Sequence, residues 1–145
     1  MKAIVIACNT ASALALDAVK DEFDLPIIGV VIPGARAAVE ATTNGKVGVV
    51  GTEATVQSGM YTKVIQGMNP KIEVIEKACP LFVPLVEEGF KEHIVTREII
   101  EYYLESMRNT DIDAMILGCT HYPLIRSTIR KVMGDKVNLV NPAYE

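Results

Sequence analysis

Two cysteines in similar surroundings are the residues of this sequence best suited to chemistry. Cys8 and Cys119 each follow an apolar run and a small residue, and the two segments read IVIACNT (residues 4–10) and MILGCTH (residues 115–121). Each pattern is typical of a buried strand that leads into a helix. A thiol at such a junction lies near the positive end of the helix dipole, which favours the thiolate. The similarity between the segments also suggests an internal repeat.

The residues beside the cysteines add hydrogen-bonding and proton-transfer groups. Asn9, Thr10 and Thr120 offer amide and hydroxyl groups, and His121 can tune the neighbouring thiol or carry a proton. Free backbone N–H groups at a helix start can hold a carboxylate. Two thiols facing each other across a small acidic ligand could remove an α-proton from one face and return a proton to the other. Racemisation of an amino acid needs this arrangement, with donors near the developing negative charge.

Strands and helices are expected to alternate along the chain. The expected strands cover residues 2–7, 27–31, 46–50, 72–75, 114–117 and 137–140. The expected helices cover residues 13–23, 35–41, 54–67, 81–89, 96–108 and 124–133, with turns at Pro33-Gly34 and Asn44-Gly45. The strands are continuously apolar, which predicts an α/β fold with a parallel sheet flanked by helices. Ligands bind beyond the carboxyl ends of such strands, where both cysteines are expected.

Composition narrows the classes of function. The chain has 145 residues, half of them apolar, and a mean hydropathy of +0.27, which suits one compact domain or two small lobes. The 14 basic residues are scattered and the net charge is −4, so no nucleic-acid partner is expected. No apolar run is long enough to span a membrane. The three cysteines lack a CxxC pair and no export signal is found, so we expect free thiols in the cytoplasm rather than disulfides or a zinc site.

Four motifs together resemble a known family. They are CNTA (residues 8–11), VVIPGA (residues 30–35), VGVVGT (residues 47–52) and GCTHYP (residues 118–123). These segments are similar to motifs of glutamate racemases, in the aspartate/glutamate racemase superfamily, and the resemblance runs along essentially the whole chain. It implies interconversion of L- and D-glutamate, without cofactor or metal, that supplies D-glutamate for peptidoglycan in the cytoplasm.

The resemblance also implies roles for particular residues. Glu87 falls where the family has an acidic residue that assists the thiol beside the histidine, and Thr52 matches a loop that closes over substrate. The implied catalytic residues are Cys8, Cys119, His121 and Glu87. The implied substrate-binding residues are Asn9, Thr10, Thr52, Thr120 and His121.

The chain departs from the family pattern at both ends. The Asp-Ser-Gly and Pro-Tyr-Gly motifs that bind substrate in the family are absent, and so is the closing helical segment. The sequence therefore resembles an internal fragment: one complete lobe and part of the other lobe of a two-lobed racemase. Residues 1–32 and 110–145 are expected to form the partial first lobe, which carries both cysteine motifs. Residues 33–109 are expected to form the second α/β lobe.

These departures leave three functional hypotheses. The first is an active glutamate racemase. The second is a catalytically silent chain that self-associates as a homo-oligomer, expected to be a dimer, because missing strands leave an apolar sheet edge. The third is a racemase of aspartate or a related acidic substrate. For single residues a structural alternative remains: Cys8 and Cys119 as buried core thiols, and Glu87 as a solvated helix residue.

Overall fold

The computed structural model describes all 145 residues and contains two parallel sheets. The strands are β1 (Ile4–Ile6), β2 (Ile27–Gly29), β3 (Lys46–Gly51), β4 (Glu73–Ala78), β5 (Ala114–Gly118) and β6 (Asn138–Val140). The α-helices are α1 (Asn9–Leu14), α2 (Leu16–Glu22), α3 (Val31–Ala41), α4 (Glu53–Gln57), α5 (Met60–Met68), α6 (Phe82–Glu87), α7 (Ile94–Arg108) and α8 (Arg126–Met133). Two 3-10 turns, η1 (Tyr122–Ile125) and η2 (Pro142–Tyr144), complete the chain.

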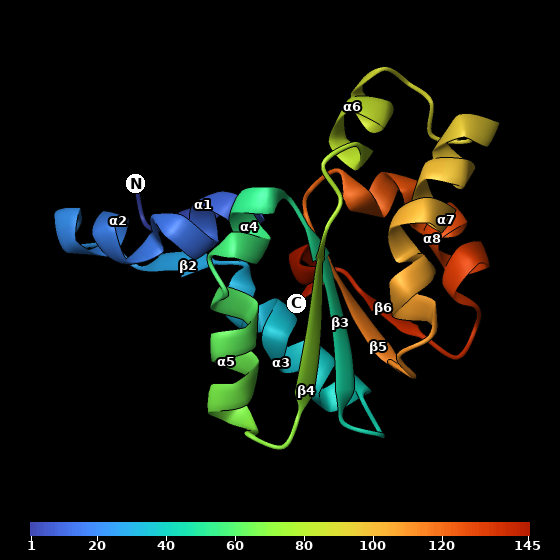
Figure 1. The fold of residues 1–145 in the computed structure, drawn as a ribbon. Helices are drawn as coiled ribbons and strands as arrows, with labels where there is room; N and C mark the ends of the chain where they lie inside the picture. Colours follow the sequence, from blue (N-terminus) through green and yellow to red (C-terminus); the bar gives the residue numbers. More distant parts are fainter.

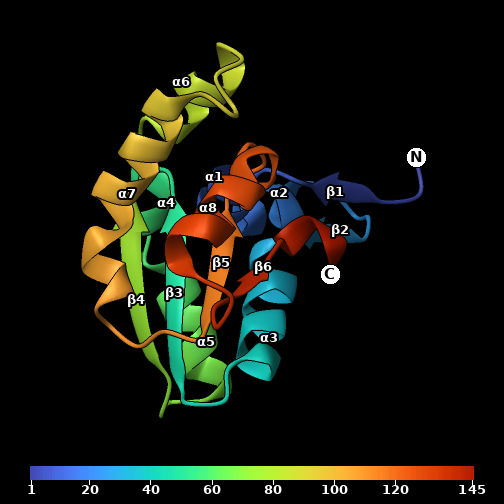
Figure 2. The same ribbon diagram turned by 90° about the vertical axis from the view of Figure 1, so that its right-hand side faces the viewer.

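The main sheet has four strands in the order β4–β3–β5–β6, all parallel (Figure 2). The central strands β3 and β5 are almost entirely buried, as their continuous apolar sequences require. Helices α3 and α5 cover one face of this sheet, and α7 and α8 cover the other (Figure 1). The expected class, a parallel sheet flanked by helices, is therefore confirmed. None of the helices is both long and apolar enough to cross a membrane.

The second sheet is much smaller and consists of β1 and β2 alone. Together with α1 and α2 it projects to one side of the main body (Figure 1). Val5 of β1 is 66% exposed and Ile28 of β2 is 53% exposed, although each is a large apolar residue in a strand. Each strand also has one free edge, because the sheet has no third strand. This unit therefore has little core of its own.

The strand pairing differs from the expected division into lobes. Residues 110–145 were expected to join residues 1–32, but β5 and β6 lie in the main sheet, where Gly118 is paired with Gly51. All five residues of β5 are buried, and such a strand needs a neighbour on both edges, which β3 and β6 supply. Cys119 therefore belongs to the larger body, and Cys8 alone belongs to the small sheet.

Several helix boundaries also differ from the predicted ones. The helix expected over residues 13–23 begins at Asn9 and is divided at Ala15 into α1 and α2. The turn expected at Pro33-Gly34 lies inside the first turn of α3, where a proline is tolerated because that N–H has no helical partner. The single helix expected over residues 54–67 is divided into α4 and α5 at Gly59, whose φ of +60° is left-handed. This division sets the direction of α5, which contributes to the site described next.

Candidate active site

Both cysteines lie just beyond the carboxyl ends of parallel strands, one from each sheet. Cys8 follows β1 and is the N-terminal cap of α1, with an extended backbone (φ −77°, ψ 126°). Cys119 directly follows β5 and is only 8% exposed, whereas Cys8 is exposed. Thr10, two residues after Cys8, bonds to Thr52, which follows Gly51. Gly51 is paired with Gly118, the residue before Cys119. The fold thus places the two thiols at one seam between the sheets.

A histidine and a glutamate extend from the buried thiol toward solvent. His121 Nδ1 lies 3.7 Å from Cys119 Sγ, and His121 Nε2 lies 3.1 Å from Glu87 Oε1. The glutamate stands at the end of α6, 34 positions away in sequence. Thr120 Oγ1 is 3.5 Å from the same Nδ1. The carboxylate can orient the imidazole, and the imidazole can exchange a proton with the thiol.

The protonation of Cys119 corrects one expectation from the sequence. Burial raises the pKa of this thiol, and the Cys8 charge adds to the increase. Hydrogen bonds from the backbone N–H groups of His121 and Thr120 and from the Thr120 side chain act in the opposite direction, but they do not outweigh burial. The element after Cys119 is the 3-10 turn η1, which begins three residues later and continues directly into α8. Burial therefore favours the neutral form of Cys119 over the thiolate.

The residues after Cys8 are fastened to the main body by side-chain hydrogen bonds. Thr10 Oγ1 lies 2.8 Å from Thr52 Oγ1 and 2.9 Å from Thr55 Oγ1. Thr52 also caps α4 by accepting a hydrogen bond from the Thr55 amide (3.2 Å). Asn9 is buried, and its Oδ1 accepts a hydrogen bond from the Tyr61 hydroxyl (2.5 Å). We call these four interactions the Asn9–Thr10 clasp.

The structure brings together most of the residues expected from the sequence. Cys119, His121 and Glu87 form one connected group, and Asn9, Thr10 and Thr52 form another. Thr55 and Tyr61 were not anticipated. Thr55 could have been found, because Thr52 precedes it by three positions in the pattern of a helix cap. Tyr61 gave no signal, because it occupies an apolar position of a helix.

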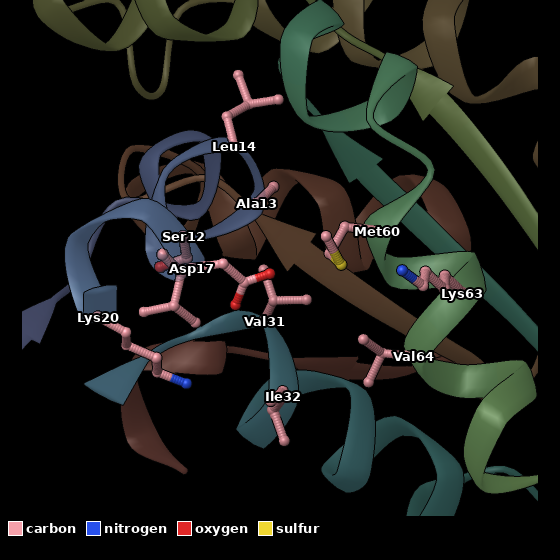
Figure 3. A pocket seen from close by; sticks show the side chains of 11 residues that line it. Ser12, Ala13, Leu14, Asp17, Lys20, Val31, Ile32, Met60, Lys63 and Val64 are labelled. Atoms are coloured by element: carbon pink, nitrogen blue, oxygen red, sulfur yellow. The ribbon is translucent and has the colours of Figure 1, made fainter. Parts of the chain in front are cut away.

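A cavity of about 320 Å³ lies on another side of α1, away from the thiols. Figure 3 shows Asp17 and Lys20 of α2 and Lys63 of α5 around it, together with apolar side chains that include Val31 and Ile32 of α3. Neither cysteine lines this cavity.

The structure contains no group of three or more His, Cys, Asp or Glu side chains placed to hold a metal ion.

Comparison with known proteins identifies relatives of the whole chain. A glutamate racemase of Geobacter metallireducens is 47% identical over 145 residues, covering 100% of this chain and 54% of that protein. The structure of glutamate racemase isoform RacE1 from Bacillus anthracis matches with a TM-score of 0.96 and 41% identity, over 100% of this chain and 55% of that one. Glutamate racemase from Francisella tularensis, in complex with D-glutamate, matches with a TM-score of 0.92 and 40% identity, over 99% of this chain and 53% of that one.

The chain spans about half the length of the curated relatives it matches. The sequence pattern of the Asp/Glu/Hydantoin racemase family matches residues 1–143. Both cysteine junctions, the histidine–glutamate pair and the clasp lie within this matched region. The chain therefore belongs to the Asp/Glu/hydantoin racemase family.

Proposed function

We propose that this chain interconverts L- and D-glutamate by a two-thiol acid/base mechanism without a cofactor. The observation that carries the proposal is the hydrogen bond between Thr10 and Thr52, which joins the segment after Cys8 to the edge of the main sheet where Cys119 follows β5. The glutamate racemases among its relatives support glutamate as the substrate. In the cytoplasm of a bacterium, this activity would supply D-glutamate for peptidoglycan.

In each direction of the reaction, one thiol acts as the base and the other as the acid. In one direction, a Cys8 thiolate removes the α-proton, and the neutral Cys119 thiol returns a proton to the opposite face of the α-carbon. In the other direction Cys119 must first lose its proton, and His121, held by Glu87, is placed to accept it. The α-carbon loses one hydrogen and gains one, so only its configuration changes.

The neighbouring polar groups can hold the substrate during this exchange. Asn9 and Thr120 directly follow the two cysteines in sequence, and their amide and hydroxyl groups can donate hydrogen bonds to carboxylates. Thr10 and Thr52 bond to each other, so in this arrangement they fix the position of α1 as well as offering hydroxyl oxygens. Donors that strengthen as negative charge develops at the α-carbon lower the barrier.

The direct test is hydrogen exchange at the substrate α-carbon. L-Glutamate incubated with the chain in deuterated water should lose its α-proton signal and form D-glutamate, and Cys8→Ser and Cys119→Ser should each abolish racemisation. Cys79→Ala is the matched control, because it removes the third thiol, which is buried away from solvent. The proposal fails if the unsubstituted chain at high concentration produces neither exchange nor D-glutamate. Competition by L-aspartate in the same assay tests the related acidic substrate.

A second candidate is a catalytically silent chain that self-associates, and the small sheet favours it. β1 and β2 each have a free edge, and Val5, Ile28 and Phe23 are more than half exposed. Such a surface gains stability by pairing with another chain. We propose a dimer joined through this unit, and Val5→Lys should weaken it. Light scattering over micromolar concentrations decides the matter, since a monomer throughout contradicts the dimer.

A further inference from the structure

Tyr61 is a fully buried residue that reaches the first cysteine motif from another element. It lies at the start of α5 and donates its hydroxyl proton to Asn9 Oδ1 at 2.5 Å. Burial raises its pKa, and the nearby Glu76 carboxylate raises it further, so the phenol stays neutral and remains a donor. Glu76 also fixes the start of α5, because Glu76 Oε1 accepts hydrogen bonds from the Thr62 amide (3.1 Å) and hydroxyl (2.6 Å).

The hydrogen bond from Tyr61 decides which way the Asn9 amide faces. The phenol has one proton and no acceptor other than Asn9 Oδ1, so the carbonyl oxygen of the amide must point toward it. The opposite orientation would leave a buried hydroxyl proton unpaired, which is costly. The Asn9 amide nitrogen has no hydrogen-bond partner in the protein, yet it is not fully enclosed, since Glu76 Oε2 is the sole fully buried side-chain atom without a partner. Both side-chain N–H donors of Asn9, the residue after Cys8, are thus left without a protein partner.

The ring of Tyr61 also lies against the second cysteine motif. A Cβ placed on Gly118, the residue before Cys119, would lie 3.5 Å from Tyr61 Cε2. A Cβ placed on Gly34 of α3 would lie 3.3 Å from the Tyr61 hydroxyl. Small residues on both sides therefore leave room for this ring. Tyr61 contacts the neighbours of both thiols, although it lies far from each in sequence.

We propose that Tyr61 is a positioning residue that holds the Asn9 amide as a two-proton donor for a substrate carboxylate. The substrate named in this inference rests on the proposed racemase function, whereas the hydrogen bond between Tyr61 and Asn9 does not depend on it. Tyr61 does not touch the substrate and acts through Asn9. Because a hydrogen bond to a charged group is a strong one, loss of the orientation should raise the KM for glutamate about tenfold and leave kcat within about a factor of three.

The test compares Tyr61→Phe in two backgrounds. In the unsubstituted chain, Tyr61→Phe should raise KM about tenfold, because a ring of the same size loses only its hydroxyl. In an Asn9→Ala background, the same substitution should leave KM unchanged, because the group it positions is gone. Tyr103→Phe on α7 is the matched control, and it should leave both constants unchanged. An equal increase in KM in both backgrounds, or no increase in either, overturns the proposal.

A second measurement remains informative if the chain does not racemise glutamate. The side-chain amide protons and nitrogen of Asn9 give assignable NMR signals whose positions report the hydrogen bond at Oδ1. Tyr61→Phe should shift or double these signals, whereas Tyr103→Phe should leave them in place. Unchanged Asn9 signals in Tyr61→Phe overturn the positioning role. Shifted signals in a chain that exchanges no α-hydrogen support that role and reject the racemase proposal alone.

Discussion

One carboxylate holds the connection between α3 and β3, and its neutralisation has an effect that can be calculated. Asp113 accepts hydrogen bonds from the Thr43 amide (2.7 Å), the Thr43 hydroxyl (2.8 Å), the Asn44 amide (2.9 Å) and the Thr42 hydroxyl. Burial alone would raise the pKa of Asp113, but these donors outweigh it and lower the pKa from 3.8 to about 2. The folded chain therefore stabilises the ionised carboxylate of Asp113 more than the neutral carboxyl group.

The size of this contribution follows from linkage. A pKa difference of one unit corresponds to about 1.4 kcal/mol, so the ionised group contributes at most about 2.5 kcal/mol to the free energy of unfolding at pH 7. Because Asp113 is partly exposed, solvent screening reduces this value to about 1–2 kcal/mol. The folded-state pKa is lowered, so this stability is fully present well above pH 3.8 and is lost as the pH falls through about 2.

Urea unfolding of Asp113→Asn at pH 7 and pH 3 measures the effect. We expect the variant to be less stable by about 1–2 kcal/mol at pH 7 and by about half as much at pH 3, where the unsubstituted chain has lost part of the contribution. Asp135→Asn is the matched control, since this exposed carboxylate makes no hydrogen bond in the structure. An equal loss of stability at both pH values would refute the reasoning, because it would mean that the charge of Asp113 is not what stabilises the turn.

Three further predictions concern the site. Alkylation by iodoacetamide, followed by mass spectrometry, should modify the exposed Cys8 first. Cys119 should react only as the pH rises, because burial raises its pKa. Cys79 should react last, because burial raises its pKa to about 12. Glu87→Gln should slow α-hydrogen exchange by up to about fivefold with little change in thermal stability, because its interaction with His121 is largely exposed. Amide hydrogen exchange should be much faster in β1 than in β5, and a fast β5 would contradict the burial of that strand.

The sequence predicts the fold where local pattern and burial agree. The continuous apolar runs of β3 and β5 are buried strands in the structure, as predicted. The break at Gly59 was not predicted, because an isolated glycine in a helical pattern is often tolerated and its positive φ is set by how α4 and α5 pack. The membership of β5 in the main sheet was missed for a different reason. Strand order depends on contacts distant in sequence, and the similarity of the two cysteine segments says nothing about which strands pair.

The sequence predicts those residues of the candidate site that stand inside a recognisable motif. Cys8, Cys119 and His121 stand in recognisable segments, and all three lie within three residues of the carboxyl end of a strand. Glu87 came from resemblance alone, and its position 3.1 Å from His121 depends on how α6 folds over η1. Tyr61 could not be found, because a tyrosine on the apolar stripe of a helix usually belongs to the core. Its hydroxyl meets Asn9 only once the chain folds and brings the starts of α5 and α1 together.

Cys119 and Cys8 follow strands that differ greatly in burial, so the position of Cys8 depends on the clasp. Cys119 follows a strand buried on both faces, whereas Cys8 follows a three-residue strand in a sheet with little core. Each neutral hydrogen bond contributes about 0.5–1.5 kcal/mol, so the few bonds made by Asn9 and Thr10 together contribute only a few kcal/mol. Together with Ala13, which is buried in the main core, these bonds hold α1 against the main body, and we expect the small sheet to open without unfolding of the large one. A ligand that contacts both thiols would add to the clasp, so we expect the distance between the thiols to depend on ligand binding while the main sheet stays unchanged.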